Sequence, residues 1–481
     1  MSATRRILPA GLALAGALGA MALVVAGALA SGREEVYLGA AALAAGGAIV
    51  YLALQFEPAW PLSIGIALSI FSGNSDRLGF PIGPDRLLIA AGLLGVVLAG
   101  LRDAEGRARR PPLRFETVHW VLLAALLWAV ASAAWAGTLS QPTGFFALLD
   151  RFGLMPFLAF LVAPVVFRTE RQRMILLGTL VVTGAYLGLT ALFEGLGLDA
   201  LVFPKYINDP SVGIHADRAR GPFVQAVAMG LGLFVCGAAA TLGIARWHRR
   251  PWLRAGCAIV AALCALGMVF TLTRAIWLGA VVALAVVTLA TPRLWRWLPV
   301  GGLLAALLVA GALAFVPGLE TSAEERSSDE SPVWVRENTN RAALAIVAER
   351  PLLGVGWERF KDQSPRWVRQ AEGIPMAGVR EGVHNVFLAN ASELGLPGAF
   401  LWLTGATLAI GGALVRRARP EVWPWRIVLL AVTVMVVVAG SVGPLPYAFP
   451  LLALWTLAGL VRAGSVPLRR GAAPHVQAQR L

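Results

Sequence analysis

The sequence has little charge and little cysteine. Only 14% of the 481 residues are charged and 58% are hydrophobic, with a mean hydropathy of +0.71. Soluble domains carry about a quarter charged residues, so this composition argues against a soluble protein. The three cysteines lie in apolar stretches, without CxxC spacing and without a nearby histidine: Cys236, Cys257 and Cys264. We therefore expect no disulfide framework, no bound metal and no cofactor.

Several catalytic and transport signals are also missing. The sequence contains no Walker phosphate loop, no GxSxG elbow and no HExxH motif. The interiors of its apolar runs hold almost no Asp, Glu, Lys or Arg, whereas ion-coupled transporters usually need carboxylates near the middle of the bilayer. This absence argues against proton-coupled transport but leaves passive flipping of a lipid open.

Long apolar runs dominate what is present. Runs of about 17–25 residues, each long enough to cross a bilayer as a helix, recur along nearly the whole chain. They predict an all-α polytopic membrane protein with about 12–14 transmembrane helices and a large extracytoplasmic loop subdomain. The candidate spans are 7–31, 36–54, 59–72, 86–101, 118–136, 152–167, 174–196, 222–244, 255–272, 275–291, 298–316, 396–415, 424–441 and 446–462. The 59–72 run is short, and a re-entrant course is the alternative for it.

The orientation follows from the arginines. The formal net charge is +14, and the basic residues gather in short loops that alternate with arginine-poor ones. These basic loops are 102–114, 168–173, 246–254, 293–296 and 416–419. The positive-inside rule places them, and with them both termini, in the cytoplasm. The charge is then explained by orientation and by contact with membrane lipids, and we expect no nucleic-acid partner.

Four regions follow from this topology. They are 1–316, with helices 1–11 and an outer loop at 197–221; the extracytoplasmic loop subdomain 317–395; 396–462, with helices 12–14; and a cytoplasmic basic tail, 463–481. The first span follows Arg5 and Arg6 and is too long for the apolar part of a signal peptide, so we predict that it is not cleaved. In the loop subdomain, the apolar spacing over 338–350 predicts an amphipathic helix, and Gly354 and Gly356 predict a tight turn.

His384 is the first candidate for chemistry. It lies on the predicted outer face just before the twelfth span, and Glu393 follows nine residues later. An imidazole titrates near neutral pH, so it can take a proton from a hydroxyl nucleophile. A polar residue that marks the membrane interface is the alternative explanation.

Arginines on the same predicted face are the second group. Arg274 joins two apolar spans with almost no loop, and a cation there is costly unless it snorkels, pairs or binds a ligand. Arg218 and Arg220 precede the eighth span, and a helix N-terminus beside guanidinium groups attracts anions. Two further outer-face candidates are Arg151, which Asp150 could neutralise, and Arg341, on the predicted amphipathic helix.

The predicted topology puts Arg220, Arg274 and His384 on one side of the membrane. Guanidinium groups bind phosphate oxygens in a bidentate manner, so two of them at the outer leaflet suit a diphosphate carried by a membrane lipid. A nearby histidine suits activation of an acceptor hydroxyl. The three side chains together predict a sugar-transfer site that opens away from the cytoplasm.

One segment resembles a known family. HNVFLANASELGLPG, at 384–398, is similar to the signature HNxxLxxxxExGxxG of the O-antigen ligase and O-antigen polymerase superfamily. The supporting segments RARGPF, TRAIWLG and RAALAIVAERPLLGVGWERF precede it in the expected order. The resemblance covers roughly residues 60–460, and its specific part is about 200–400.

The resemblance implies an inverting, metal-independent glycosyltransferase of the bacterial inner membrane, with its active site facing the periplasm. The implied donor is a glycan on undecaprenyl diphosphate, and the implied acceptor is lipid A core, a growing polysaccharide or a protein. Arg220 and Arg274 match the arginines thought to hold the diphosphate. His384 matches the histidine thought to activate or align the acceptor. Glu393 matches the motif glutamate, for which the resemblance implies a role in orienting or packing rather than in the reaction itself. The loop before His384 is expected to act as a lid, hinged near Gly354 and Gly356.

The sequence departs from the family pattern in three places. Val224, Gln225 and Ala226 replace an Asn-Pro-Asn, Thr273 replaces a serine before the arginine, and fourteen predicted spans exceed the expected twelve. Within the superfamily, the alternative to a ligase is a chain-extending polymerase. Outside it, the alternatives are a transporter or flippase for lipid-linked glycan or small anions, and a sensory or scaffold protein with a vestigial site.

Overall fold

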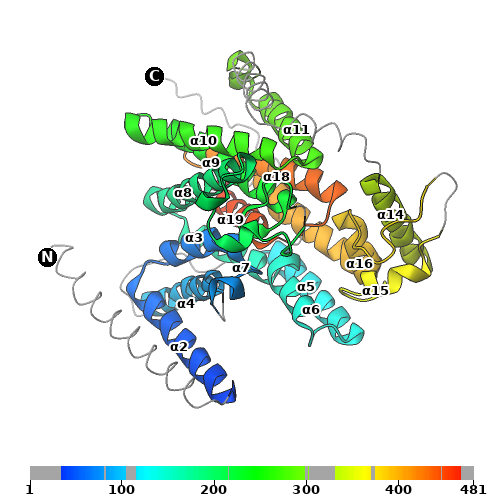
Figure 1. Cartoon of the computed structure of the whole chain (residues 1–481). Helices are drawn as coiled ribbons and strands as arrows, with labels where there is room; N and C mark the ends of the chain where they lie inside the picture. Colours follow the sequence, from blue (N-terminus) through cyan, green and yellow to red (C-terminus); the bar gives the residue numbers. More distant parts are fainter. Residues whose placement is uncertain are drawn as a thin grey trace, which may run out of the picture. The chain divides into compact units, whose positions relative to one another are not determined.

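The computed structural model describes residues 34–80, 83–104, 115–214, 216–297, 302, 331–369, 374–445 and 447–466 (Figure 1). Predictions for the spans at 7–31 and 298–316, and for the tail beyond 466, lie outside these residues. The other twelve predicted spans all fall on helices. Within the described ranges, eight helical segments are long and apolar enough to cross a membrane, and four shorter apolar helices accompany them. The prediction of an all-α polytopic membrane protein is confirmed.

The chain divides into two compact units. Unit 1 comprises 1–113, 165–272 and 448–450, and unit 2 comprises 114–164, 273–447 and 451–481. Unit 1 is built from α2 (Glu34–Gln55), α3 (Ala59–Leu68), α4 (Pro84–Ala104), α8 (Glu170–Gly195), α9 (Ala226–Arg246) and α10 (Pro251–Phe270). Its short 3-10 turns are η1 (Ser69–Phe71), η2 (Asp76–Leu78), η4 (Asp199–Leu201), η5 (Lys205–Asn208) and η6 (Gly221–Phe223).

Small residues let the helices of unit 1 approach closely. Helices α8, α9 and α10 pack against one another. A Cβ at Gly184 of α8 would lie 2.8 Å from Cys236 Cβ, and a Cβ at Gly188 would lie 2.8 Å from Leu263 Cβ. Close backbone approach at small residues is the usual means of packing helices in a membrane, where the hydrophobic effect does not drive helix association. The buried Cys236 takes part in this packing, as expected of a structural thiol.

Unit 2 carries the rest of the chain. Its longer helices are α5 (Thr117–Ala136), most of α7 (Leu154–Val166), α11 (Arg274–Ala290), α14 (Ser331–Glu349), α16 (Val386–Ala406), α18 (Trp423–Val442) and most of α19 (Ala448–Ala463). Its shorter elements are α6 (Pro142–Phe146), η3 (Ala147–Phe152), η7 (Pro292–Trp297), α15 (Phe360–Gln363), η8 (Ser364–Arg366), η9 (Thr407–Gly411) and α17 (Gly412–Val415). Strands β1 (Arg417–Ala418) and β2 (Ser465–Val466) form one short antiparallel pair.

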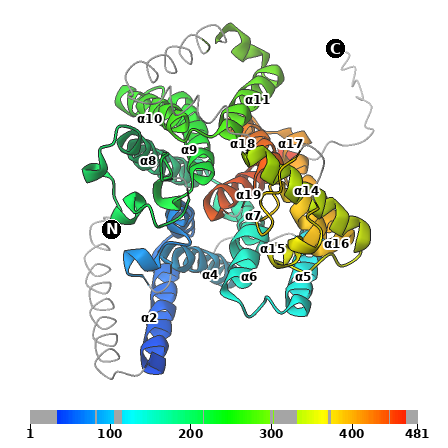
Figure 2. The same cartoon turned by 45° about the vertical axis from the view of Figure 1, so that its right-hand side comes forward.

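The loop subdomain predicted at 317–395 is more helical than expected. Helix α14 begins at Ser331 rather than at 338, and α16 begins at Val386, ten residues before the predicted span. The hydropathy pattern missed this second start because polar residues interrupt the first turns of α16. Helices α14, α15 and α16 lie side by side (Figures 1 and 2). They enclose a small core of Ala342, Ala343, Ile346, Val355, Phe360, Trp367, Val368 and Val383.

Candidate functional site

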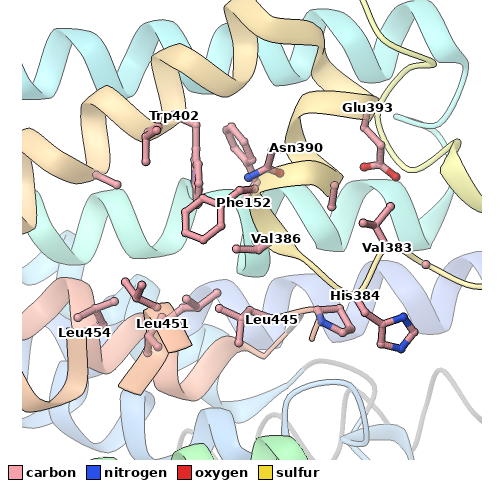
Figure 3. Close-up of a pocket in the computed structure, with 18 of the residues that line it drawn as sticks. Phe152, Val383, His384, Val386, Asn390, Glu393, Trp402, Leu445, Leu451 and Leu454 are labelled. Atoms are coloured by element: carbon pink, nitrogen blue, oxygen red, sulfur yellow. The ribbon is translucent and has the colours of Figure 1, made fainter. Parts of the chain in front are cut away.

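A cavity of about 660 Å³ lies wholly within unit 2. Its polar end is lined by Glu358, Lys361, Arg380, Glu381, His384, Asn390 and Glu393, and its apolar end by Trp402, Leu403, Ile410, Leu414, Val436, Leu451, Leu454 and Trp455. Figure 3 shows His384 and Glu393 at one end, and Trp402, Leu451 and Leu454 at the other. Mostly apolar walls with a few convergent polar groups are typical of ligand sites. This cavity suits an amphipathic ligand.

The start of α16 fixes the position of His384. Asn385 is the N-cap of this helix, and its side-chain oxygen accepts hydrogen bonds from the backbone N–H groups of Phe387 and Leu388. Its amide nitrogen donates to the Ser441 carbonyl at 3.2 Å, at the end of α18. Asparagine is among the preferred capping residues because it satisfies N–H groups that have no partner within the helix. The HN pair of the motif therefore combines the candidate histidine with the helix cap that follows it.

The surroundings of His384 keep its ring neutral. The side chain is half-buried, and its Nδ1 atom is buried without a hydrogen-bond partner in the described part of the chain. Burial lowers the pKa of His384, and the charges of Arg336 and Lys361 lower it further. Glu381 and the backbone of Gly382 oppose this shift in part. A neutral imidazole at neutral pH can accept a proton, which is what activation of a hydroxyl requires.

Arg336, on α14, was not among the residues that the sequence marked, although its charge acts on His384. Its Nε atom is buried and has no hydrogen-bond partner among the residues that the structure describes. Burial and the charge of Arg274 both lower the pKa of Arg336, while Arg336 in turn lowers that of His384. The guanidinium of Arg336 thus lies within electrostatic reach of both predicted site residues. A helix predicted to begin at 338 left Arg336 in a polar loop, so nothing in the pattern marked it.

Arg274 lies at the junction between α10 and α11. It is the first residue of α11 and is exposed, and Thr273 is the N-cap. In the described ranges, neither Arg274 nor Arg336 forms an ion pair with a carboxylate. The N–H groups at a helix N-terminus also favour an anion. The charge of Arg274 acts on Arg336, and the charge of Arg336 acts on His384.

Glu393 both lines the cavity and accepts a hydrogen bond from the backbone of a neighbouring segment. The residue is 8% exposed, and its Oε1 accepts a hydrogen bond of 3.4 Å from the N–H of Phe360, the first residue of α15. The carboxylate also lines the cavity. This contact holds the segment after Trp357 against α16. The predicted orienting role of Glu393 stays a prediction, and the structure supplies a physical basis for it.

A kink in α16 receives the turn that contains Gly354 and Gly356. The backbone at Gly395 leaves helical geometry, with φ of 70° and ψ of 174°. The carbonyls of Ser392 and Glu393 consequently accept hydrogen bonds from Val355 N–H at 2.9 Å and Gly356 N–H at 3.0 Å. In a straight helix these carbonyls would accept hydrogen bonds from N–H groups one turn later in the same helix. At the kink they accept hydrogen bonds from the 354–356 turn instead. These two hydrogen bonds anchor the turn to α16, and its predicted role as the hinge of a lid stays a prediction.

Glycine is required on both sides of this anchor. Gly354 and Gly395 have φ values of +64° and +70°. A Cβ at Gly354 would lie 2.3 Å from the Ser392 carbonyl oxygen, and a Cβ at Gly395 would lie 2.2 Å from the Leu352 carbonyl oxygen. Only glycine adopts such φ values at little cost and also permits so close an approach. The glycines of GVG and ELG thus fix how the two motif segments meet.

Arg220 belongs to unit 1, where its guanidinium has partners within its own loop. The side chain is 2% exposed and donates to the carbonyls of Ile207, Asp209 and Val212 at 2.6–3.1 Å. The backbone N–H groups of Arg220 and Gly221, at the start of η6, donate to the carboxylate of Glu194. Four hydrogen bonds occupy most of the five N–H donors of the guanidinium. This arrangement folds the 197–221 loop onto itself, and a role for Arg220 in binding diphosphate stays a prediction.

The remaining predicted arginines differ in setting. Arg218 is half-buried in the same loop of unit 1. Arg341 is 55% exposed and pairs with Glu337 one turn earlier on α14. The backbone of Arg151 lies in π-helical η3, and its side chain is outside the described part. Of the predicted set, Arg274, His384, Glu393 and Arg341 belong to unit 2, and Arg218 and Arg220 belong to unit 1.

No group of three or more His, Cys, Asp or Glu side chains suited to hold a metal occurs within the described ranges. The polar end of the cavity carries Lys361, Arg380 and His384 together with the carboxylates of Glu358, Glu381 and Glu393.

Comparison with known proteins agrees with the sequence motif. Residues 258–403 match the family model described as O-Antigen ligase. The matched segment contains Arg274, Arg336, His384 and Glu393, and it confirms the resemblance to the O-antigen ligase and O-antigen polymerase superfamily. Together with the apolar helices, the match indicates a bacterial membrane protein with a glycosyltransferase-like activity. No match was found among curated proteins.

Proposed function

We propose that this chain, whose residues 258–403 carry the O-antigen ligase domain, transfers a glycan from undecaprenyl diphosphate to an acceptor hydroxyl. The family match supports the reaction class. The observation that carries the specific proposal is the position of His384 at the polar end of an amphipathic cavity, where burial and the charge of Arg336 lower the pKa of its imidazole. A base next to cations suits a reaction in which a hydroxyl loses a proton and a diphosphate departs.

The reaction is a single displacement. The acceptor oxygen attacks the anomeric carbon from the face opposite the diphosphate, which inverts the configuration, while the hydroxyl proton passes to His384. The bond between the anomeric carbon and the diphosphate oxygen breaks, and its electron pair leaves with the polyprenyl diphosphate. Positive groups fixed where negative charge develops stabilise such a transition state. General-base assistance of this type contributes about 10²–10⁴-fold.

The site residues divide this work. Arg274 binds the diphosphate, and its position at the start of α11 adds the N–H groups of a helix N-terminus. The apolar end of the cavity, around Trp402 and Leu451, accommodates part of the isoprenoid chain. Glu393 and the turn at Gly354 position the residues around His384. We assign Arg220 to ordering the 197–221 loop.

The location follows from charge asymmetry. Arginine-rich loops such as 246–254 and 416–419 face the cytoplasm by the positive-inside rule, so both termini lie inside and His384 faces the periplasm. The donor is then taken from the outer leaflet of the cytoplasmic membrane. The acceptor is lipid A core, a growing polysaccharide or a protein.

A reconstitution experiment tests the reaction. Purified full-length protein in liposomes is given a lipid-linked glycan and an acceptor glycan, with EDTA and without nucleotide. The wild-type protein and the control His248→Ala, which alters an exposed histidine of unit 1, are expected to form the glycosidic bond, whereas His384→Ala is not. Movement of donor across the bilayer without bond formation would establish a flippase instead.

A chain-extending polymerase is the second candidate, because the same site chemistry serves both reactions. The acceptor distinguishes them. Repeated addition to the product of the first transfer identifies a polymerase, and one transfer to a lipid-anchored core identifies a ligase.

A further inference from the structure

A groove of about 780 Å³ runs between α3 and α8, wholly within unit 1. One side is formed by α3 and η1, and the other by a single face of α8. On that face, residues that line the groove recur every three or four positions: Arg171, Ile175, Gly178, Val182 and Tyr186. The groove shares no residue with the cavity that contains His384 in unit 2.

The hydroxyl groups that line the groove are already hydrogen-bonded within the protein. The side chains of Thr179 and Thr183 donate to carbonyls one turn earlier in α8, both at 2.9 Å. The phenol of Tyr186 donates to the Phe203 carbonyl at 2.8 Å. Because these donors are used, the long wall of the groove suits a hydrocarbon chain rather than a polar ligand.

Gly178 leaves the floor of the groove open. A Cβ added there has no neighbour within 4 Å in the described part of the chain, whereas a Cβ at Gly184 on the same helix would lie 2.8 Å from Cys236 Cβ. Val182, one turn after Gly178, is 70% exposed, and Trp60 on the facing α3 is exposed as well. Gly184 therefore serves helix packing, and Gly178 makes room for a ligand.

The two ends of the groove differ in charge. At one end, the rings of Phe71 and Tyr186 lie 5.8 Å apart. At the other end, the side chain of Arg171 is 76% exposed, and its Nη1 lies 3.3 Å from a carboxylate oxygen of Glu57. A guanidinium has five N–H donors, so an ion pair through one nitrogen holds Arg171 in place and leaves donors for phosphate oxygens.

The apolar length of the groove matches one leaflet of a bilayer. From Met174 to Tyr186, α8 rises about 18 Å, and half of the hydrocarbon core is about 15 Å thick. The positive-inside rule places the basic loop 168–173 at the cytoplasmic surface, where anionic lipids attract arginine. One acyl chain lying along α8 would therefore bring its headgroup phosphate to Arg171.

We propose that this groove binds one anionic phospholipid of the cytoplasmic leaflet, with an acyl chain over Gly178 and the headgroup phosphate on Arg171. This lipid site goes beyond sugar transfer and does not depend on it. Helix α3 and η1 together span only Ala59–Phe71, well short of the roughly 20 residues that cross a bilayer. The bound lipid fills the space beside this short segment and stabilises its packing against α8.

Lipid titration followed by native mass spectrometry tests the headgroup site. The purified, delipidated full-length protein in detergent is titrated with phosphatidylglycerol, with phosphatidylcholine of the same acyl chains and with farnesyl phosphate. The wild-type protein is expected to bind one phosphatidylglycerol about fivefold more tightly than phosphatidylcholine, since one arginine near the membrane surface contributes about this preference. Arg171→Ala is expected to lose the preference. Arg249→Ala, at an exposed arginine of unit 1 outside the groove, is expected to keep it.

A matched pair of glycine variants tests the position of the chain. Gly178→Leu fills the groove, so it is expected to weaken the binding of both phospholipids about tenfold or more. Gly100→Leu adds the same side chain outside the groove, where an added Cβ again has no neighbour within 4 Å in the described part, and is expected to bind like wild type. Thermal melting establishes that each variant is folded. If Gly178→Leu does not fold, Val182→Trp, in the same groove, decides by the same criterion.

Three results would overturn the proposal. Equal affinity of the wild-type protein for the two phospholipids would show that no anionic headgroup is selected. Binding by Gly178→Leu equal to that by Gly100→Leu would show that no acyl chain lies over Gly178. Tighter binding of farnesyl phosphate than of phosphatidylglycerol, lost in Gly178→Leu, would assign the groove to an isoprenoid lipid instead.

Discussion

Arginine lies in two contrasting settings in this chain. In unit 1, Arg220 is buried and its donors meet the carbonyls of Ile207, Asp209 and Val212. In unit 2, Arg336 has a buried Nε–H without a partner in the described part, and the charge of Arg274 lowers its pKa. A guanidinium surrounded by carbonyls stabilises a fold, whereas one that lacks an acceptor and has a cation for a neighbour suits an anionic ligand. The role of an arginine therefore depends on whether the protein itself supplies hydrogen-bond acceptors for its guanidinium group.

Removing each arginine in turn gives the largest expected effect. Arg274→Ala changes an exposed side chain, so we expect normal folding and a fall of about 10²–10³-fold in kcat/KM for transfer. Arg220→Ala leaves three carbonyls without a donor, at about 1–3 kcal/mol each, so we expect the free energy of unfolding to fall by several kcal/mol. Thermal melting and the transfer assay on both variants separate stability from catalysis. If Arg220→Ala melts like wild type but loses transfer activity, our assignment of Arg220 to ordering the 197–221 loop is wrong. Arg220 would then bind the diphosphate of the lipid-linked glycan.

The anchor between the turn and α16 provides the next effect. Gly395→Ala places a Cβ against the Leu352 carbonyl at a positive φ, so we expect a loss of about 2–4 kcal/mol in the free energy of unfolding. Gly100→Ala is the control, because no atom lies within 4 Å of the added Cβ, and it should be neutral or slightly stabilising. Chemical denaturation of the purified proteins measures both. Equal stability of the two variants would show that the anchor does not hold unit 2 together.

The pH dependence of transfer tests whether the charges around His384 set the pKa of its imidazole. Its pKa is lowered, so the ring is the neutral base at neutral pH, and the rate should fall as the pH drops through this lowered value. Arg336→Gln removes a charge that lowers this pKa, so the acidic limb of the rate profile should move to higher pH. Glu381→Gln removes a charge that raises it, so the limb should move to lower pH. Rate profiles of the purified variants test both signs, and shifts in the same direction would contradict the electrostatic account.

Arg341 gives the smallest expected effect on stability. Its side chain is 55% exposed and pairs with Glu337 across one helical turn. Exposed pairs of this kind contribute about 0.3–0.5 kcal/mol, so Arg341→Ala should leave the melting temperature nearly unchanged. Transfer by this variant also tests the sequence prediction that Arg341 binds the diphosphate, and a fall of more than about tenfold would restore that role.

The sequence predicts the helices better than it predicts their ends or contacts. Twelve of the spans predicted from hydropathy coincide with helices of the structure. They are easy to recognise because a helix that crosses a bilayer must be apolar over most of its length. Hydropathy misses the start of α16 because the Asn385 cap, rather than apolarity, begins that helix. It also misses Arg336, since the first turns of α14 are polar and are fixed by Asn338 contacts 37 and 39 residues away.

The candidate site is predictable in part for the same reason. His384 and Glu393 lie in a contiguous motif, so a pattern finds them. The partners of Arg220 depend on the path of the loop through Ile207 and Val212, and no local pattern distinguishes a guanidinium enclosed by carbonyls from one open to a ligand.

The most direct test of the central claim is a single-turnover measurement on His384→Gln in the reconstituted protein, with donor binding measured in parallel. The account predicts a rate of glycosidic bond formation about 10²–10⁴-fold below wild type, with donor affinity nearly unchanged, because the variant removes the base and leaves the arginines in place. Bond formation at the wild-type rate would contradict it and show that the imidazole takes no proton from the acceptor.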